Sequence, residues 1–81
     1  MPLYFFHLRD GTDTLLDPEG REIDSVDELP AKALADARSI IGHDAVKGRI
    51  RLDQHIDVED EAGNILHIVH FIDAVEIVFP A

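Results

Sequence analysis

Five histidines are the residues of this sequence whose chemistry could support metal binding or proton transfer. His67 and His70 stand three positions apart in a segment of strand character, so their side chains point to opposite faces of a sheet and cannot bind one metal ion together. His7, His43 and His55 could meet only through the tertiary fold. The sequence therefore predicts no metal site and no cofactor. A small-molecule or metal-binding domain that uses histidines and carboxylates is kept as an alternative function.

The acidic residues follow no recognisable ligand or catalytic pattern. The run from Asp57 to Glu61 lacks the alternating ligands and the mid-loop glycine of an EF-hand. A catalytic carboxylate pair needs a cleft and a shifted pKa, and the sequence indicates neither. The chain also has no cysteine, no Gly-x-Ser-x-Gly elbow and no phosphate-binding glycine motif. No catalytic residue is predicted, and a non-enzymatic protein is favoured.

The charge of the chain restricts its partners. Seven Lys and Arg stand against 17 Asp and Glu, which gives a net charge of −10. Such a field repels nucleic-acid phosphates and anionic lipids. No apolar run approaches the roughly 18 residues of a membrane span, and the N-terminus does not resemble a signal peptide. We therefore expect a cytoplasmic protein that binds neither nucleic acid nor membranes.

The elements that must position these side chains fit one domain, residues 1–81. The aromatic segment from Leu3 to Arg9 is a predicted strand that enters a turn at Asp10-Gly11, and Thr12 to Leu16 pairs back as a hairpin. A further turn at Asp17 to Gly20 precedes a short extension of the sheet at Arg21 to Asp24.

A helix is predicted from Ser25 or Asp27 to Lys47, and its beginning allows two alternatives. Ser25 and Glu28 match a capping box, but that start places Pro30 one turn inside the helix. With Asp27 as the cap, or with a loose first turn, Pro30 is tolerated, and this start is preferred. The apolar stripe of the helix is thin, and it consists of Ala33, Ala37, Ile40 and Ile41.

Two strands are predicted after the helix. The first lies within Ile50 to Asp60, and a turn at Glu61 to Asn64 leads to the second, Ile65 to Phe71. The second strand is apolar on both faces, which favours a central place in the sheet. The tail from Ile72 to Phe79 is either a further strand or a short helix. The β-β-α-β-β order predicts an α+β fold, in which one helix packs on one face of a small antiparallel sheet.

A single thin helix leaves apolar surface on the sheet uncovered. The predicted interaction surface comprises Tyr4, Phe6, Leu8, Ile77 and Phe79. An alternating aromatic strand beside an apolar tail suits self-association. The sequence therefore predicts an interaction module that forms a homodimer or docks on another protein.

Several motifs resemble a family of short, uncharacterised bacterial proteins. The opening from Met1 to Gly11 is similar to the Met-Pro-x-Tyr-Phe-Phe-His start and the Asp-Gly turn of that family. The Asp17 to Gly20 turn, the alanine-rich Ala31 to Ala37, Gly63 and the Phe71 to Val75 segment match later motifs. The family is a domain of unknown function, so the resemblance implies a small α+β fold and carries over no catalytic residue.

Overall fold

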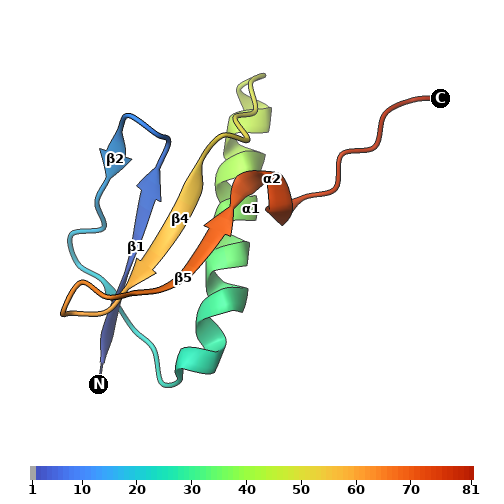
Figure 1. The fold of residues 1–81 in the computed structure, drawn as a ribbon. Coiled ribbons are helices and arrows are strands. Elements are labelled where there is room, and N and C mark those ends of the chain that lie inside the picture. The colour runs from blue at the N-terminus through green and yellow to red at the C-terminus, as the bar shows by residue number, and fades with distance from the viewer. Residues whose placement is uncertain (1) are drawn as a thin grey trace.

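The computed structural model describes residues 2–81 and has one long helix behind an antiparallel sheet (Figure 1). In chain order the elements are β1 (Leu3–Arg9), β2 (Thr14–Leu15), β3 (Arg21–Glu22), a 3-10 turn η1 (Val26–Glu28), α1 (Leu29–Val46), β4 (His55–Glu59), β5 (Ile65–His70) and α2 (Phe71–Ala74). The predicted α+β class and the placement of one helix on one face of the sheet are confirmed.

The strand order of the sheet is β2-β1-β4-β5, and β3 pairs with the other end of β1. β1 and β4 run through the middle, with Phe6 opposite Val58 and Leu8 opposite Ile56. The prediction of a central strand at Ile65 to Phe71 was wrong, because β5 is an edge strand with β4 as its strand neighbour. Its apolar residues have two different environments, since Val69 is buried and Ile68 is exposed.

The start of the helix combines the two predicted alternatives. Ser25 accepts a hydrogen bond from the Asp27 N–H at 3.2 Å, and the Glu28 carboxylate accepts one from the Ser25 N–H at 3.2 Å. This capping box closes the 3-10 turn η1, and α1 begins after it. Pro30 therefore falls in the first turn of α1, where its missing N–H costs no helical hydrogen bond. The loose first turn is confirmed, whereas Asp27 as the cap was wrong.

The core lies between α1 and one face of the sheet. Ala33 and Ala37 are fully buried and bring the helix backbone close to β4 and β5. The same layer contains Tyr4, Phe6, Ile56, Val58 and Val69 from the strands, with Leu29 and Phe71. Because the two alanines let the large side chains of the sheet pack directly against the helix, the stability of the fold depends on close packing at these positions.

The C-terminal segment forms a short helix and then leaves the body. The Ala74 carbonyl at the end of α2 accepts a hydrogen bond from Arg38 Nε at 2.8 Å. Val75 then adopts an extended conformation, and the following residues project away from the domain (Figure 1). The short-helix alternative for the tail is therefore confirmed. Within residues 2–81, neither helix is both long enough and apolar enough to cross a membrane.

Replacement of Ala37 by Leu should reduce the free energy of unfolding by about 1–3 kcal/mol, because no space exists between α1 and the sheet for three more carbons. Chemical denaturation monitored by circular dichroism measures this change. Ala35→Leu is the matched control, since Ala35 is exposed on the same helix, and its effect should stay within about 0.5 kcal/mol. Equal losses from the two variants would contradict the assigned packing face.

Candidate interaction surface

The face of the sheet opposite α1 carries a network of charged side chains. Arg9 on β1 donates from Nε to Asp57 Oδ2 and from Nη2 to Glu59 Oε2, the second at 3.1 Å. The hydrogen bond to Asp57 raises the pKa of the Arg9 guanidinium by more than burial lowers it. Asp57 is 4% exposed, so Arg9 compensates a carboxylate that is almost removed from water.

Three histidines surround this network. His7 Nε2 lies 3.8 Å from Glu59 Oε2, and His7 Nδ1 accepts a hydrogen bond from the Asp17 N–H at 3.0 Å. His55 Nε2 lies 3.2 Å from Asp57 Oδ1, but no hydrogen bond forms, so this buried oxygen lacks a donor among residues 2–81. His55 and His70 are paired across β4 and β5, with ring centroids 5.3 Å apart.

Strand alternation explains which histidines meet. Positions 7 and 9 of β1 and positions 55, 57 and 59 of β4 share one face, and β5 adds His70 to it. His67 lies on the other face, as predicted from its spacing to His70, and His43 is exposed on α1. Among residues 2–81 no group of three or more histidines, aspartates or glutamates is arranged to hold a metal ion.

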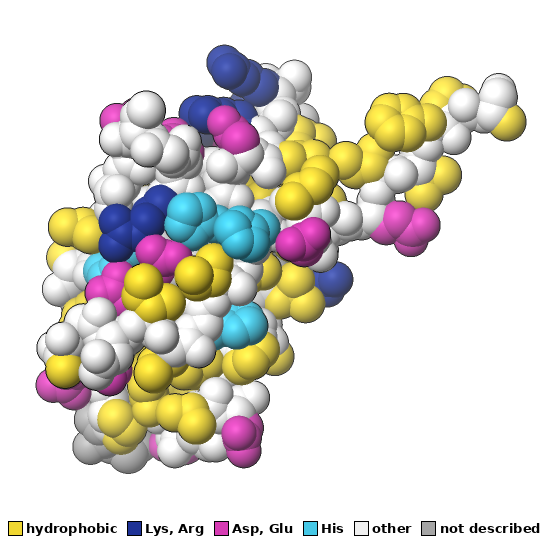
Figure 2. Space-filling view, viewed as in Figure 1, with side chains coloured by type: hydrophobic (Ala, Val, Ile, Leu, Met, Phe, Trp, Pro, Cys, Tyr) yellow, Lys and Arg dark blue, Asp and Glu magenta, His cyan; other side chains and the backbone are white. Residues whose placement is uncertain are grey.

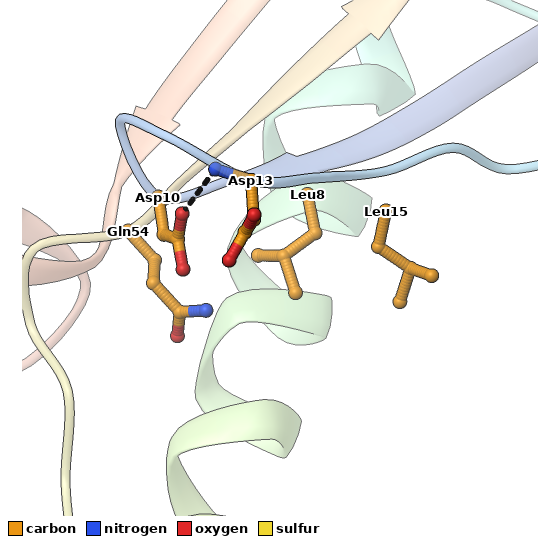
Figure 3. Close-up of a pocket in the computed structure, with 5 residues that line it drawn as sticks. All are labelled: Leu8, Asp10, Asp13, Leu15 and Gln54. Carbon is orange, nitrogen blue, oxygen red and sulfur yellow. Dashed lines mark hydrogen bonds between the residues drawn. The ribbon is translucent and has the colours of Figure 1, made fainter.

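A pocket of about 170 Å³ at the tip of the β1–β2 hairpin is the other place where carboxylates converge (Figure 3). Asp10 and Asp13 line it together with Leu8, Leu15 and Gln54. Asp10 Oδ1 accepts the Asp13 N–H at 2.8 Å, and its Oδ2 accepts from Arg51 Nη1 at 3.2 Å. The Asp10 carboxylate is thus used to close the hairpin and to bind the loop before β4.

Hydrophobic side chains border the charged network along β5. Ile65, Leu66 and Ile68 are 54%, 45% and 43% exposed. Figure 2 shows histidine and charged side chains gathered on this face, with hydrophobic side chains beside them and along the projecting tail. We call Ile65, Leu66 and Ile68 the β5 patch.

The structure does not place the five residues of the predicted interaction surface on one surface. Tyr4 and Phe6 are buried under α1, and Leu8 is half-buried against the same core. Ile77 and Phe79 are exposed in the tail. The correction has a simple cause, because the sequence shows which residues of a strand share a face but not which face the helix covers. The β5 patch was missed, although the apolar run on both faces of Ile65 to Phe71 was its signal.

A turn at residues 17–20 fixes the edge of β1 that lies away from β4 and β5. The Asp17 carboxylate accepts the N–H groups of Phe6 at 3.2 Å, Glu19 at 3.3 Å and Gly20 at 3.1 Å. Burial raises the pKa of the Asp17 carboxyl, but these three hydrogen bonds lower it by more, so the pKa lies below its ordinary value. Gly20 has a φ of 73° and lies against the Phe5 ring, so a side chain here would be strained and would collide with that ring.

The fold and this surface define a small α+β domain with one face of its sheet not covered by a helix. Residues 2–81 contain no cluster that could hold a metal ion. The chain belongs to the family described as a domain of unknown function, DUF6894, whose model matches residues 3–72. No curated protein and no solved structure gave a significant match. The family match ends before the tail.

Replacement of Arg9 by Met should lower the free energy of unfolding by about 1–3 kcal/mol, because Asp57 would stay buried without its cation. The lower half of this range is expected, since water screens an arginine whose side chain is 32% exposed. Arg49→Met removes the same charge at an exposed position and is the control, with a change of about 0.5 kcal/mol or less. Urea unfolding of both variants at neutral pH tests this difference.

The Asp17 carboxylate should make folding sensitive to acid. Its pKa is lowered by folding, so it stabilises the protein above its unfolded pKa and this contribution is lost as the pH falls through about 4 and below. Asp17→Asn keeps an acceptor oxygen but does not titrate. Between pH 5 and 3 (about one unit on either side of an ordinary Asp), the wild type should lose more unfolding free energy than the variant. Parallel stability curves over that interval would refute the role of Asp17.

Proposed function

We propose that this protein is a non-enzymatic interaction module that forms a homodimer through β5. The observation that carries this proposal is that β5 is a six-residue edge strand with exposed hydrophobic side chains. An edge strand presents a row of unpaired N–H and C=O groups, and such an edge pairs readily with another strand.

Several of the usual protections against edge pairing are missing from β5, although its pairing with β4 has one register shift, at Val58 and Glu59. Proteins commonly block an exposed edge with lysine, proline, an inward-pointing charge or a very short strand. The sequence of β5 is Ile-Leu-His-Ile-Val-His, which contains no proline, lysine, arginine or carboxylate. An edge of this composition supports a strand that is paired in the functional protein.

The charge distribution also favours this edge. Two copies with a net charge of −10 each repel one another, so they can approach only where few carboxylates are uncompensated. β5 contributes no carboxylate, and Arg9 pairs with both Asp57 and Glu59 on the neighbouring strand, so it offsets one of their two negative charges. The β5 side of the sheet is therefore a suitable place for contact between two acidic molecules. The same net charge supports the expectation of a protein that binds neither nucleic acid nor membranes. The cytoplasm stays the proposed location, because no segment resembles a signal peptide or a membrane span.

A second candidate function is the binding of a small polar molecule beside His55 and His70. One observation favours it, namely the buried Asp57 Oδ1, which lacks a hydrogen-bond donor next to these rings. A ligand with an N–H or O–H group could satisfy this oxygen. Thermal shift screening against zinc and small amines tests this function, and an unchanged melting temperature throughout would count against it.

Replacement of Ile68 by Glu should weaken the homodimer at least about tenfold, because the substitution removes apolar surface from the interface and places a carboxylate there without a cationic partner. Native mass spectrometry at low micromolar concentration, supported by sedimentation velocity, measures the dimer fraction. Val46→Glu is the matched control, since Val46 is 89% exposed at the far end of α1, and the dimer should be unaffected. A wild-type protein that is monomeric at every concentration tested would rule out the proposed function.

A further inference from the structure

We propose that the extended tail of one copy, residues 75–81, adds as an antiparallel strand to the β5 edge of a second copy, and that the two copies exchange tails reciprocally. This inference rests on the proposed homodimer and assigns the segment that each copy contributes to it.

The tail has the composition of a strand without a sheet, and its first residue is extended. Val75 is extended, with φ −137° and ψ 154°, and the chain then projects from the body (Figure 1). Ile77 is 47% exposed, and Val78 and Phe79 are each 80% exposed. A segment of β-branched and aromatic residues that stands in water gains stability by pairing with an apolar edge.

The side chains of the tail and of β5 match in one antiparallel register. With Phe79 opposite His67, the pairs that follow are Val78 with Ile68, Ile77 with Val69 and Glu76 with His70. Val69 lies on the helix side of the sheet, and Ile68 and His70 lie on the open side. The register therefore places Ile77 over the core side, Val78 against the β5 patch, and a carboxylate opposite an imidazole.

A shift of one residue would destroy this match. Strand side chains alternate between faces, so the shift would turn Glu76 toward the apolar layer and Ile77 toward the charged network. The register is consequently specified by both hydrophobicity and charge.

A pocket at the receiving edge fits the aromatic end of the tail. Val26, Leu29, Pro30, Leu66 and His67 line this space of about 270 Å³ between the start of α1 and β5. Because His67 is one of its walls, the residue opposite His67 is the one that reaches it. In the proposed register that residue is Phe79, the largest side chain of the tail.

The area is sufficient for a stable dimer. An extended chain exposes about 1.45 Å² per dalton, so the six residues of the tail beyond Val75 expose roughly 1,000 Å². If each tail buries about half of this area and covers as much of its partner, a reciprocal pair buries about 2,000 Å². Stable interfaces commonly bury about 1,200–2,000 Å².

An engineered disulfide tests the register directly, because the sequence contains no cysteine. In the double variant Ile68→Cys with Val78→Cys, the paired Cα atoms would lie about 4.5–5.5 Å apart, within disulfide range. Mild oxidation should produce a covalent dimer, detected by mass spectrometry under denaturing, non-reducing conditions. His67→Cys with Val78→Cys is the control, since these side chains would point to opposite faces and crosslink poorly. An oxidised monomer, or no crosslink in either variant, would overturn the proposal.

Truncation after Val75 separates this inference from the proposed homodimer. The truncated protein keeps Val75, which packs against the core, and its far-ultraviolet circular dichroism shows whether it folds. We expect dimerisation about 100-fold weaker than for the full chain, since Ile77, Val78 and Phe79 would be lost from the interface. If the truncated protein dimerises as the full chain does, the tail exchange is wrong and the homodimer stands. If the full chain is itself monomeric, both are wrong.

Discussion

Antiparallel pairing of β1 with β4 is the constraint on which the other features of the structure depend. This pairing places Phe6 beside Val58 under α1 and, on the other face, brings Arg9 within reach of Asp57 and Glu59. One ladder of backbone hydrogen bonds thus produces both the core and the charged network, because successive side chains of each strand point to opposite faces. The face of the sheet without a helix therefore carries charged side chains that pair with one another.

Asp57 places a nearly buried carboxylate on the face of the sheet that α1 does not cover. A hydrophobic residue there would enlarge the exposed apolar surface and favour non-specific association. A carboxylate with an arginine partner costs desolvation energy and contributes little net stability, but it makes approach to this face dependent on a matching partner. The β5 patch lies next to this network. A partner that bound at β5 would have to cover the apolar side chains and also avoid repulsion from the carboxylates. Such a combination favours specificity over affinity.

Local signals in the sequence were sufficient for the elements but not for their three-dimensional arrangement. The strand from Leu3 to Arg9, the hairpin at Asp10-Gly11 and the capping box at Ser25 follow from turn chemistry and from period-two patterning, and they could be predicted. The edge position of β5 could not be predicted, because an edge strand whose exposed face is also apolar has the same pattern as a central strand. The convergence of His7, His55 and His70 also depends on pairing register, which single-strand patterns do not contain. The sequence pointed to Tyr4 and Phe6 as interaction residues, although they are core residues, because strand alternation does not show which face of the sheet the helix covers.

The family match covers the domain but not its tail. The family model covers residues 3–72, which contain the whole sheet and α1, and it ends within α2. The β5 edge therefore belongs to the family fold, whereas the apolar segment around Ile77 and Phe79 lies beyond the matched region.

An exposed edge strand can pair with different partners in different proteins of one fold. Backbone hydrogen bonds supply affinity without regard to sequence, while the alternate side chains determine which partner is chosen. A self-derived strand is one way to fill it: an attached segment has a high effective concentration near its partner edge once the first contact has formed. The charge of this chain would make that route advantageous, since the proposed reciprocal exchange would add apolar contacts between two molecules that their net charge otherwise keeps apart.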